Sequence, residues 1–367
     1  MGDDGHLDAL RSRPAGDKPC VAITMGDPAG IGAEVIAKAL ADPEIRSLGR
    51  FIIFGMEEPL DLAAGLAELD TCWYRCPHDE VMSVQSGVVL ADYDEYSVGL
   101  GLRHPNSECG AASLRFVEDA IQATRDGLAD VVVTGPIHKI SWRLAGCKLP
   151  GHTELLSDRF KCKRVTMMFA GGPLKVALAS THVGLFELRN RFTIGLVFQP
   201  IDLLDDALRR YWGIQCPRIA VAGLNPHAGD GGRFGDEESR IIEPAIIMAR
   251  EAGILVEGPF AVDTIFHSVI DGRYDGVVVM YHDQGMIPIK LLAFDTAVNI
   301  TLGLPIIRTS VDHGPAFDIA GRNKANPGSM KAAIRLACTL ASAPSFDIPR
   351  VPFPVEDQTA FVPRSQM

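Results

Sequence analysis

The sequence contains no apolar run that approaches the roughly 20 residues needed to cross a bilayer. It also has no excess of positive charge, because 35 Lys and Arg stand against 46 Asp and Glu, giving a net charge of −11. Nucleic acids and anionic membrane surfaces select proteins with a basic face, so we predict that this chain binds neither. An anionic ligand would require a few cations gathered at one place.

The sequence also lacks the features typical of secreted proteins and of proteins with a structural zinc site. The first residues, MGDDGHLDALRSRPAGDK, have no apolar segment of the kind found in a signal peptide. The eight cysteines are scattered, and the one close pair, Cys72 and Cys76, has no second pair to complete a zinc site. We therefore expect reduced thiols in a soluble, cytoplasmic protein.

What the 367 residues do contain is an alternation of short apolar runs and amphipathic stretches. Unbroken runs such as CVAITMG, ADVVVTG and DGVVVMY are typical of strands buried on both faces of a parallel sheet. RVTMMFA and LKVALAS lie close together and predict neighbouring strands, and VNITLGLPIIRTS predicts a strand, a turn and a strand. Helices are predicted over 109–128, 201–212, 236–252, 283–293 (broken near Pro288) and 328–341. The predicted fold class is α/β, with two lobes, three α/β/α layers and mostly parallel sheets.

The distribution of turn residues suggests where the chain passes between the lobes. Turn residues at 146–151 and near 302–305 favour a first lobe of 19–150 plus 305–345 and a second lobe of 151–304. Residues 1–18 are predicted to form a loose extension and 346–367 a tail.

Half of the ten histidines directly follow an apolar run. They are His138, His182, His227, His282 and His313. Ligands gather at the carboxyl ends of strands in open α/β sheets, and imidazole is the commonest neutral metal ligand. The set therefore predicts a metal or catalytic site, although any single histidine could instead cap a strand or fill a polar pocket. Spacing alone does not say which of the five would bind a metal.

Two aspartates stand where they could support such histidines. Asp283 is adjacent to His282, and Asp263 follows the apolar stretch PFAV. A carboxylate beside a ligating histidine orients the ring and raises its basicity. The alternative for each aspartate is a helix cap or a turn residue.

Two further segments predict an anion site. After the break at Pro150-Gly151, His152 and Thr153 open a helix, whose free N–H groups and dipole favour a phosphate or carboxylate. Ordinary capping by Thr153 is the alternative. Lys290, Asn299 and Arg308 follow on successive elements, and the two cations would offset the acidic net charge, although each could also be a solvated surface group.

Glycine-rich segments do not identify a cofactor site. MGDPAGIG joins a predicted strand to a predicted helix, yet its spacing is G-x3-G-x-G rather than the dinucleotide pattern G-x-G-x-x-G. A nicotinamide cofactor would therefore bind in another way, and its residues are not assigned. LNPHAGDGG around His227 fits either close approach of a ligand or a plain surface loop.

Taken together, the segments TMGDPAGIG, TGPIHK, GHTELL, ALASTH, GLNPHAGDGG, YHDQG, NITLGLPIIRTSVDHG and AGRNKA occur in an order that closely resembles the 4-hydroxythreonine-4-phosphate dehydrogenase family of pyridoxal phosphate biosynthesis. The resemblance runs from about residue 20 to 340. It implies an isocitrate/isopropylmalate dehydrogenase-like fold, a group that lacks the usual dinucleotide pattern.

The resemblance also implies roles for particular residues. It places the metal on His182, His227 and His282, with Asp263 and Asp283 in support. Substrate contacts would come from His152, Thr153, Lys290, Asn299 and Arg308. Further implications are NAD or NADP, one divalent metal (Zn, Mg or Co) per site, and a homodimer that shares its interlobe active sites through the second lobe.

The implied reaction is metal-dependent oxidation of 4-phosphooxy-L-threonine to 2-amino-3-oxo-4-phosphooxybutanoate, followed by decarboxylation to 3-amino-2-oxopropyl phosphate. Sister enzymes that act on threonate or erythronate 4-phosphate, or on an aromatic cis-dihydrodiol acid, share the same motifs and remain alternatives. A three-histidine metallohydrolase of a phosphoester is the alternative from another enzyme class. A catalytically silent binding protein is the third.

Overall fold

The computed structural model describes residues 18–81, 84–99 and 101–343. The tail predicted from residue 346, and all but the last residue of the extension predicted before residue 19, lie outside these ranges.

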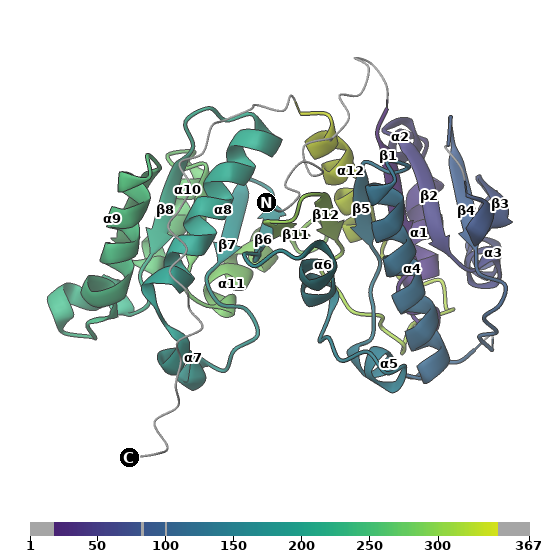
Figure 1. The fold of residues 1–367 in the computed structure, drawn as a ribbon, viewed down its shortest axis with the longest axis horizontal. Helices are drawn as coiled ribbons and strands as arrows, with labels where there is room; N and C mark the ends of the chain where they lie inside the picture. The colour runs from purple at the N-terminus through teal and green to yellow at the C-terminus, as the bar shows by residue number, and fades with distance from the viewer. Residues whose placement is uncertain (1–17, 82–83, 100, 344–367) are drawn as a thin grey trace, which may run out of the picture.

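A single twelve-stranded sheet runs through the molecule, in the order β3-β4-β2-β1-β5-β12-β11-β6-β7-β10-β8-β9 (Figure 1). The strands are β1 (Cys20–Thr24), β2 (Arg50–Gly55), β3 (Trp73–Pro77), β4 (Val88–Asp92), β5 (Val131–Thr134), β6 (Thr166–Gly171), β7 (Leu174–Leu178), β8 (Arg218–Ala222), β9 (Leu255–Phe260), β10 (Gly276–Val279), β11 (Val298–Leu302) and β12 (Ile307–Ser310).

The strands are parallel except in the middle of the sheet. β12–β11, β11–β6 and β6–β7 pair antiparallel, and the other eight neighbouring pairs are parallel. The predicted α/β class with a mostly parallel sheet is confirmed, and so are the adjacent strands β6 and β7 and the strand–turn–strand of β11 and β12. The last strand in the chain, β12, is inserted between β5 and β11 near the centre of the sheet.

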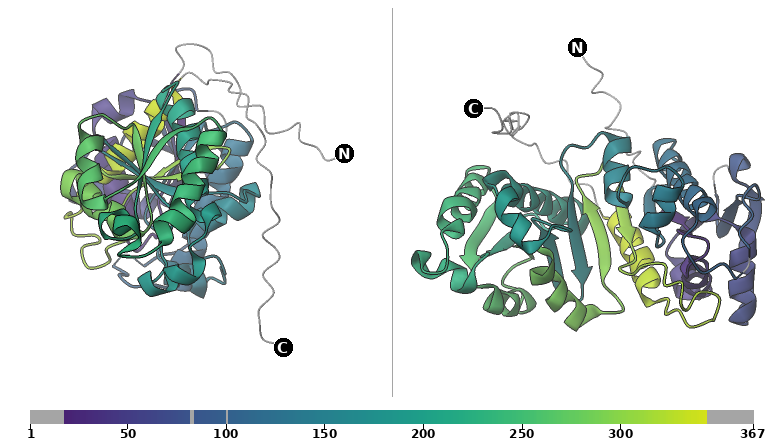
Figure 2. Two further views of the ribbon diagram at one scale, coloured as in Figure 1. Left: turned by 90° about the vertical axis from the view of Figure 1, so that its left-hand side faces the viewer. Right: turned by 90° about the horizontal axis from the view of Figure 1, so that it is seen from below.

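Helices cover both faces of this sheet (Figure 2). They are α1 (Gly32–Leu40), α2 (Pro43–Ser47), α3 (Glu57–Leu66), α4 (Ser107–Arg125), α5 (Lys139–Leu144), α6 (His152–Phe160), α7 (Leu185–Arg191), α8 (Ile194–Trp212), α9 (Glu243–Glu251), α10 (Val262–Ile270), α11 (His282–Ala293) and α12 (Gly328–Ala341), with short turns η2 (His78–Glu80), η3 (Pro226–Gly232) and η4 (Glu238–Ile242). Helix α4 packs on β1, β2 and β5, α8 on the strands from β11 to β8, and α11 on β6, β7 and β10. Among the described residues, no helix combines the length and apolar character needed to cross a membrane.

Two helix predictions were wrong in detail. Pro288 does not break the helix after Tyr281, because α11 continues through it from His282 to Ala293. Burial of Met286 and Ile289 against the sheet outweighs the backbone hydrogen bond that the proline removes. The single helix predicted over 236–252 begins instead with a π-helical turn, η4, before the regular helix α9.

The division into two lobes stays a prediction. In the sheet, β1 to β5 and β12 form one end, and β6 to β11 form the other. All eight cysteines are reduced thiols, of which Cys20, Cys109 and Cys338 are buried and Cys216 is exposed.

Candidate active site

The order of strands in the sheet sorts the five histidines into two sets. His182, His282 and His227 follow β7, β10 and β8, which are adjacent and mutually parallel. Their carboxyl ends therefore lie at one edge of the sheet. His138 and His313 follow β5 and β12, a second adjacent parallel pair.

Two of the first three histidines meet in this chain. The ring centroids of His182 and His282 lie 5.9 Å apart. Asp283 Oδ1 lies 2.8 Å from Nδ1 of His282, which leaves Nε2 of that ring free to bind a ligand. Partial desolvation, together with the nearby positive charge of Lys139, lowers the pKa of His182 and favours the neutral imidazole that metals bind.

The third histidine, His227, lies on an unusual turn. Residues 227–231 all have left-handed backbone angles, with φ between 43° and 82°. Such angles cost about 1–2 kcal/mol for each residue that is not glycine, here His227, Ala228 and Asp230. The His227 side chain is exposed, and its ring centroid lies 6.2 Å from that of Phe234.

The donor chemistry fits a divalent cation, but one chain does not complete the site. Neutral imidazoles from adjacent strand ends, one of them oriented by a carboxylate, are the ligands that Zn²⁺ and related ions select. Over the described parts of a single chain, no three His, Cys, Asp or Glu side chains are placed to hold a metal ion together. We call the pair His182 and His282 the half-site, because a metal ion held by these two rings would need at least one further donor.

A cavity of about 650 Å³ opens beside His182. Four of the five residues predicted to bind substrate line it: His152, Thr153, Asn299 and Arg308. Its walls come from the loop after β5, the start of α6, the ends of β6 and β7, and strands β11 and β12. Volumes in this range are typical of small-molecule and cofactor sites.

Arg308 supplies a buried positive charge to the cavity. It is only 3% exposed, and each hydrogen bond described for its guanidinium goes to a hydroxyl oxygen: Nη2 and Nε to Thr134 Oγ1, at 2.6 and 3.2 Å, and Nη1 to Thr301 Oγ1, at 3.1 Å. Burial lowers the pKa of Arg308 to about 9, with Glu154 opposing the shift. A buried cation that is held by neutral groups is matched by an anionic ligand.

Several polar atoms in the cavity wall lack a partner in the described structure. They are His152 Nε2, Asn299 Oδ1 and His313 Nε2. Buried polar groups are normally hydrogen-bonded, so these atoms indicate a polar ligand. Burial and the charge of Arg308 lower the pKa of His152 well below 6.5, so its imidazole is neutral.

The other predicted residues do not line this cavity. Lys290 forms an ion pair with Asp312 and also donates to the Asp312 carbonyl oxygen at 3.2 Å, and Asp312 lines the cavity. Asp263, in the first turn of α10, is exposed and does not line the cavity. His227, His282 and Asp283 are not among the lining residues either.

Residues that sequence reasoning missed include Thr134, Glu154 and Asp312. Each lies within a segment already singled out, TGPIHK, GHTELL or NITLGLPIIRTSVDHG, but a hydroxyl or carboxylate at such a position has no distinctive spacing. His313 was found as a strand-end histidine, and the structure places it in the cavity wall without a metal-binding partner set.

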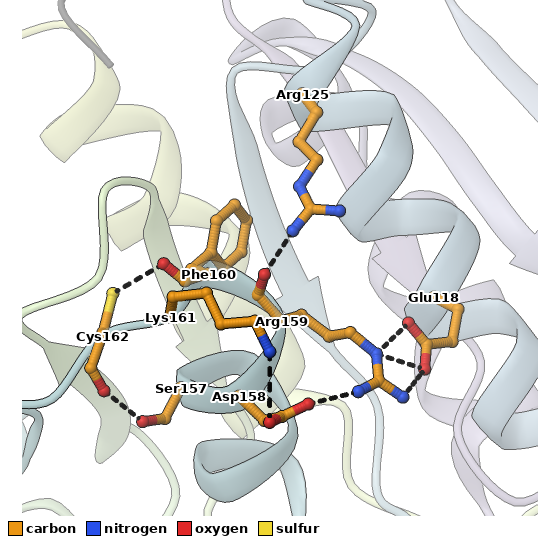
Figure 3. A network of polar contacts seen from close by, with 8 residues as sticks. All are labelled: Glu118, Arg125, Ser157, Asp158, Arg159, Phe160, Lys161 and Cys162. Carbon is orange, nitrogen blue, oxygen red and sulfur yellow. Dashed lines mark hydrogen bonds and ion pairs between the residues drawn. The ribbon is translucent and has the colours of Figure 1, made fainter. Parts of the chain in front are cut away.

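Helix α6 presents its first turn to the cavity because its far end is fastened to α4. The Arg159 guanidinium binds both carboxylate oxygens of Glu118, at 2.6 to 3.0 Å, and Arg125 donates to the Arg159 carbonyl oxygen (Figure 3). The N-cap of α6 is Gly151, with no side-chain cap. The alternative of capping by Thr153 is therefore wrong, and the Thr153 side chain lies in the cavity wall instead.

The glycines of MGDPAGIG serve packing. A Cβ on Gly26 would lie 2.3 Å from the Pro136 carbonyl oxygen, and one on Gly30 would lie 2.7 Å from Pro315. They allow the loops after β1, β5 and β12 to approach one another closely.

Comparison with known proteins agrees with this geometry. The model of the family described as pyridoxal phosphate biosynthetic protein PdxA matches residues 50–337. The 4-hydroxythreonine-4-phosphate dehydrogenase of Geobacter metallireducens is 44% identical over 88% of this chain and 96% of its own length. The D-threonate 4-phosphate dehydrogenase of Cupriavidus necator is 41% identical over 88% of this chain and 98% of its own length.

A solved structure extends the match to three dimensions. The crystal structure of 4-hydroxythreonine-4-phosphate dehydrogenase from Klebsiella pneumoniae superposes with a TM-score of 0.79 at 38% identity, covering 88% of this chain and all of that one. These matches confirm the predicted resemblance and the assignment as an oxidoreductase. The chain therefore belongs to the family of the pyridoxal phosphate biosynthetic protein PdxA.

Proposed function

We propose that this protein oxidises 4-phosphooxy-L-threonine at its C3 hydroxyl, with NAD or NADP as hydride acceptor, and that the 3-keto acid then loses CO₂ to give 3-amino-2-oxopropyl phosphate. The reaction belongs to pyridoxal phosphate biosynthesis, and the reduced thiols are consistent with work in the cytoplasm.

The observation that carries the proposal is Arg308. A guanidinium that is 3% exposed, bound to hydroxyls in every hydrogen bond described for it and lining a cavity of about 650 Å³, is suited to the phosphate or carboxylate of the substrate. The free N–H groups at the start of α6 lie in the same cavity and favour the same charge.

Neutral side chains then orient the rest of the substrate. His152 Nε2 and Asn299 Oδ1 are free to hydrogen-bond the hydroxyl and ammonium groups of the substrate. Lys290, paired with Asp312 at the cavity wall, would neutralise developing negative charge or move a proton.

A divalent metal would be held by His182 and His282, with a His227, from this chain or from a second copy of it, as third ligand and with Asp283 orienting His282. When bound, such an ion withdraws electron density from the substrate oxygen, which favours hydride departure and decarboxylation. Asp263 is proposed as a supporting carboxylate. The choice among Zn, Mg and Co is left to metal analysis.

We further propose a homodimer with shared active sites. Helix α7 begins shortly after His182 and helix α11 begins at His282 itself, and large apolar side chains are exposed on or next to both helices. Phe186 is 94% exposed, Leu291 80% and Phe294 71%. A second copy that covers these helices would approach the half-site and could supply the missing donor.

Dehydrogenation of D-threonate 4-phosphate is the second candidate. The relative of that name is 41% identical to this chain, against 44% for the relative named for 4-hydroxythreonine 4-phosphate. Both molecules carry a phosphate and a secondary alcohol, so the buried Arg308 serves either.

A turnover screen tests the proposal. The metal-loaded protein is given 4-phosphooxy-threonine, threonate 4-phosphate, erythronate 4-phosphate or an aromatic cis-dihydrodiol acid, each with NAD and with NADP, and absorbance of the reduced nicotinamide is recorded. The fastest turnover is expected with 4-phosphooxy-threonine. Release of inorganic phosphate without nicotinamide reduction would instead indicate a metallohydrolase.

A further inference from the structure

The left-handed turn at 227–231 is built around a buried carboxylate, that of Glu238. Glu238 is 4% exposed, although it belongs to the π-helical turn η4 at the surface end of α9. Its Oε1 accepts hydrogen bonds from the backbone N–H groups of Leu224, at 2.8 Å, and Asn225, at 2.7 Å. Its Oε2 accepts one from Asn225 Nδ2, at 2.9 Å.

The turn closes tightly over the same carboxylate. A Cβ on Gly229 would lie 2.8 Å from Glu238 Oε2, and one on Gly223 would lie 3.1 Å from Oε1. Both residues must therefore be small for the chain to wrap around Glu238, with His227 carried on the outside of the turn.

A second buried side chain ties this turn to the end of β10, the strand that precedes His282. Gln284 is 6% exposed, accepts from the Met280 N–H at 2.8 Å and donates to the Gly223 carbonyl oxygen at 2.9 Å. Gln284 thus joins the ends of β10 and β8, and Glu238 continues the connection to the two residues before Pro226-His227.

We infer that Glu238 is the positioning residue of His227, holding its strained turn in the conformation that binds metal before any metal arrives. The inference rests on the proposed role of His227 as a metal ligand. A left-handed turn with three residues other than glycine needs contacts that fix it, and strain of this kind collects at functional sites. Without the carboxylate, two backbone N–H groups lose their acceptor and metal binding must first order the turn.

The experiment measures Zn²⁺ affinity by chelator competition on the metal-free full chain, for Glu238→Ala, Glu238→Gln and Glu243→Gln. Glu243, exposed at the start of α9, is a charge-matched control. We expect Glu238→Ala to weaken Zn²⁺ binding about 10–100-fold, as for other groups that orient metal ligands. Glu238→Gln, which keeps one oxygen for the two backbone N–H groups, should weaken it less, and the control not at all.

A second readout does not involve metal. Hydrogen exchange of the metal-free protein should be faster at 223–232 in Glu238→Ala and unchanged in the strands β7 and β10. If Glu238→Ala fails to fold, the inference is tested by comparing Glu238→Gln with Glu243→Gln. Equal Zn²⁺ affinity in both of those variants, with equal exchange at 223–232, would overturn the inference. His227→Ala distinguishes the metal-ligand role of His227 from the positioning role of Glu238. If His227→Ala leaves the Zn²⁺ affinity unchanged, the proposed role of His227 is wrong. If His227→Ala weakens Zn²⁺ binding but the Glu238 variants do not, only the role of Glu238 is wrong.

Discussion

Replacing Arg308 with methionine should separate ligand binding from folding, because the guanidinium is buried and forms no ion pair with any residue that the structure describes. Burial lowers the pKa of Arg308 from the ordinary arginine range to about 9, which at roughly 1.4 kcal/mol per pKa unit corresponds to a cost on the order of 5 kcal/mol for keeping the charge buried. The hydrogen bonds to Thr134 and Thr301 offset much of it. Arg308→Met should therefore change the free energy of unfolding by less than about 2 kcal/mol.

The effect on binding should be much larger. A guanidinium that makes two charge-assisted hydrogen bonds to a phosphate, each contributing about 1.5–3 kcal/mol, provides about 3–6 kcal/mol. At about 1.4 kcal/mol per factor of ten, Arg308→Met should weaken substrate binding by about 10²–10⁴-fold. Calorimetric titration with 4-phosphooxy-threonine measures this, and denaturant unfolding without ligand measures the stability.

The refuting result is a structural one. Removing one partner of a buried ion pair typically costs about 3–5 kcal/mol. If Arg308→Met loses that much stability without ligand and retains substrate affinity, the guanidinium holds the fold together and the cavity lacks the anion site that the proposed function requires.

The remaining predictions concern the metal half-site, the apolar helices and pH. Asp283→Asn should weaken metal binding about 10–100-fold, because it removes the carboxylate 2.8 Å from His282 Nδ1; unchanged affinity in a chelator titration would contradict that role. Leu291→Asp places a charge on an exposed apolar side chain of α11 and should convert the dimer to a monomer in sedimentation velocity. It should also abolish turnover while the circular dichroism spectrum stays unchanged. A variant that stays dimeric would exclude α11 from the interface. The folded state keeps His152 neutral, whereas the unfolded state takes up a proton there below pH about 6.5. The free energy of unfolding should therefore decrease as the pH is lowered below this value, by up to about 1.4 kcal/mol per pH unit. His152→Asn should flatten this dependence in urea melts at pH 5 to 7, and an unchanged slope would refute the assignment.

The elements that could be predicted from sequence were those whose signal is local. Runs such as ADVVVTG and RVTMMFA identified β5 and β6 because a strand buried on both faces has no polar alternation. The helix predicted at 328–341 coincides with α12. Pro288 led to a wrong prediction of a helix break. The backbone hydrogen bond that this proline removes is outweighed by the packing of α11 on the sheet, which is a tertiary effect.

The site could be predicted only in part, because strand order is not local. Five histidines were equivalent as strand-end residues, and the sheet order sorted them into three that follow β7, β10 and β8 and two that follow β5 and β12. The burial of Arg308 and the left-handed turn at His227 leave no trace in residue spacing, since each depends on contacts with residues far away in the chain.

The late insertion of β12 has a consequence for how the protein is made. Since β12 lies between β5 and β11, a ribosome must synthesise more than 300 residues before the central gap in the sheet can be filled. Until then β5 and β11 each present an unpaired edge, the kind of surface on which nascent chains associate. Premature termination before Ile307 would leave both edges permanently open, so truncated products should be aggregation-prone and cleared by proteases.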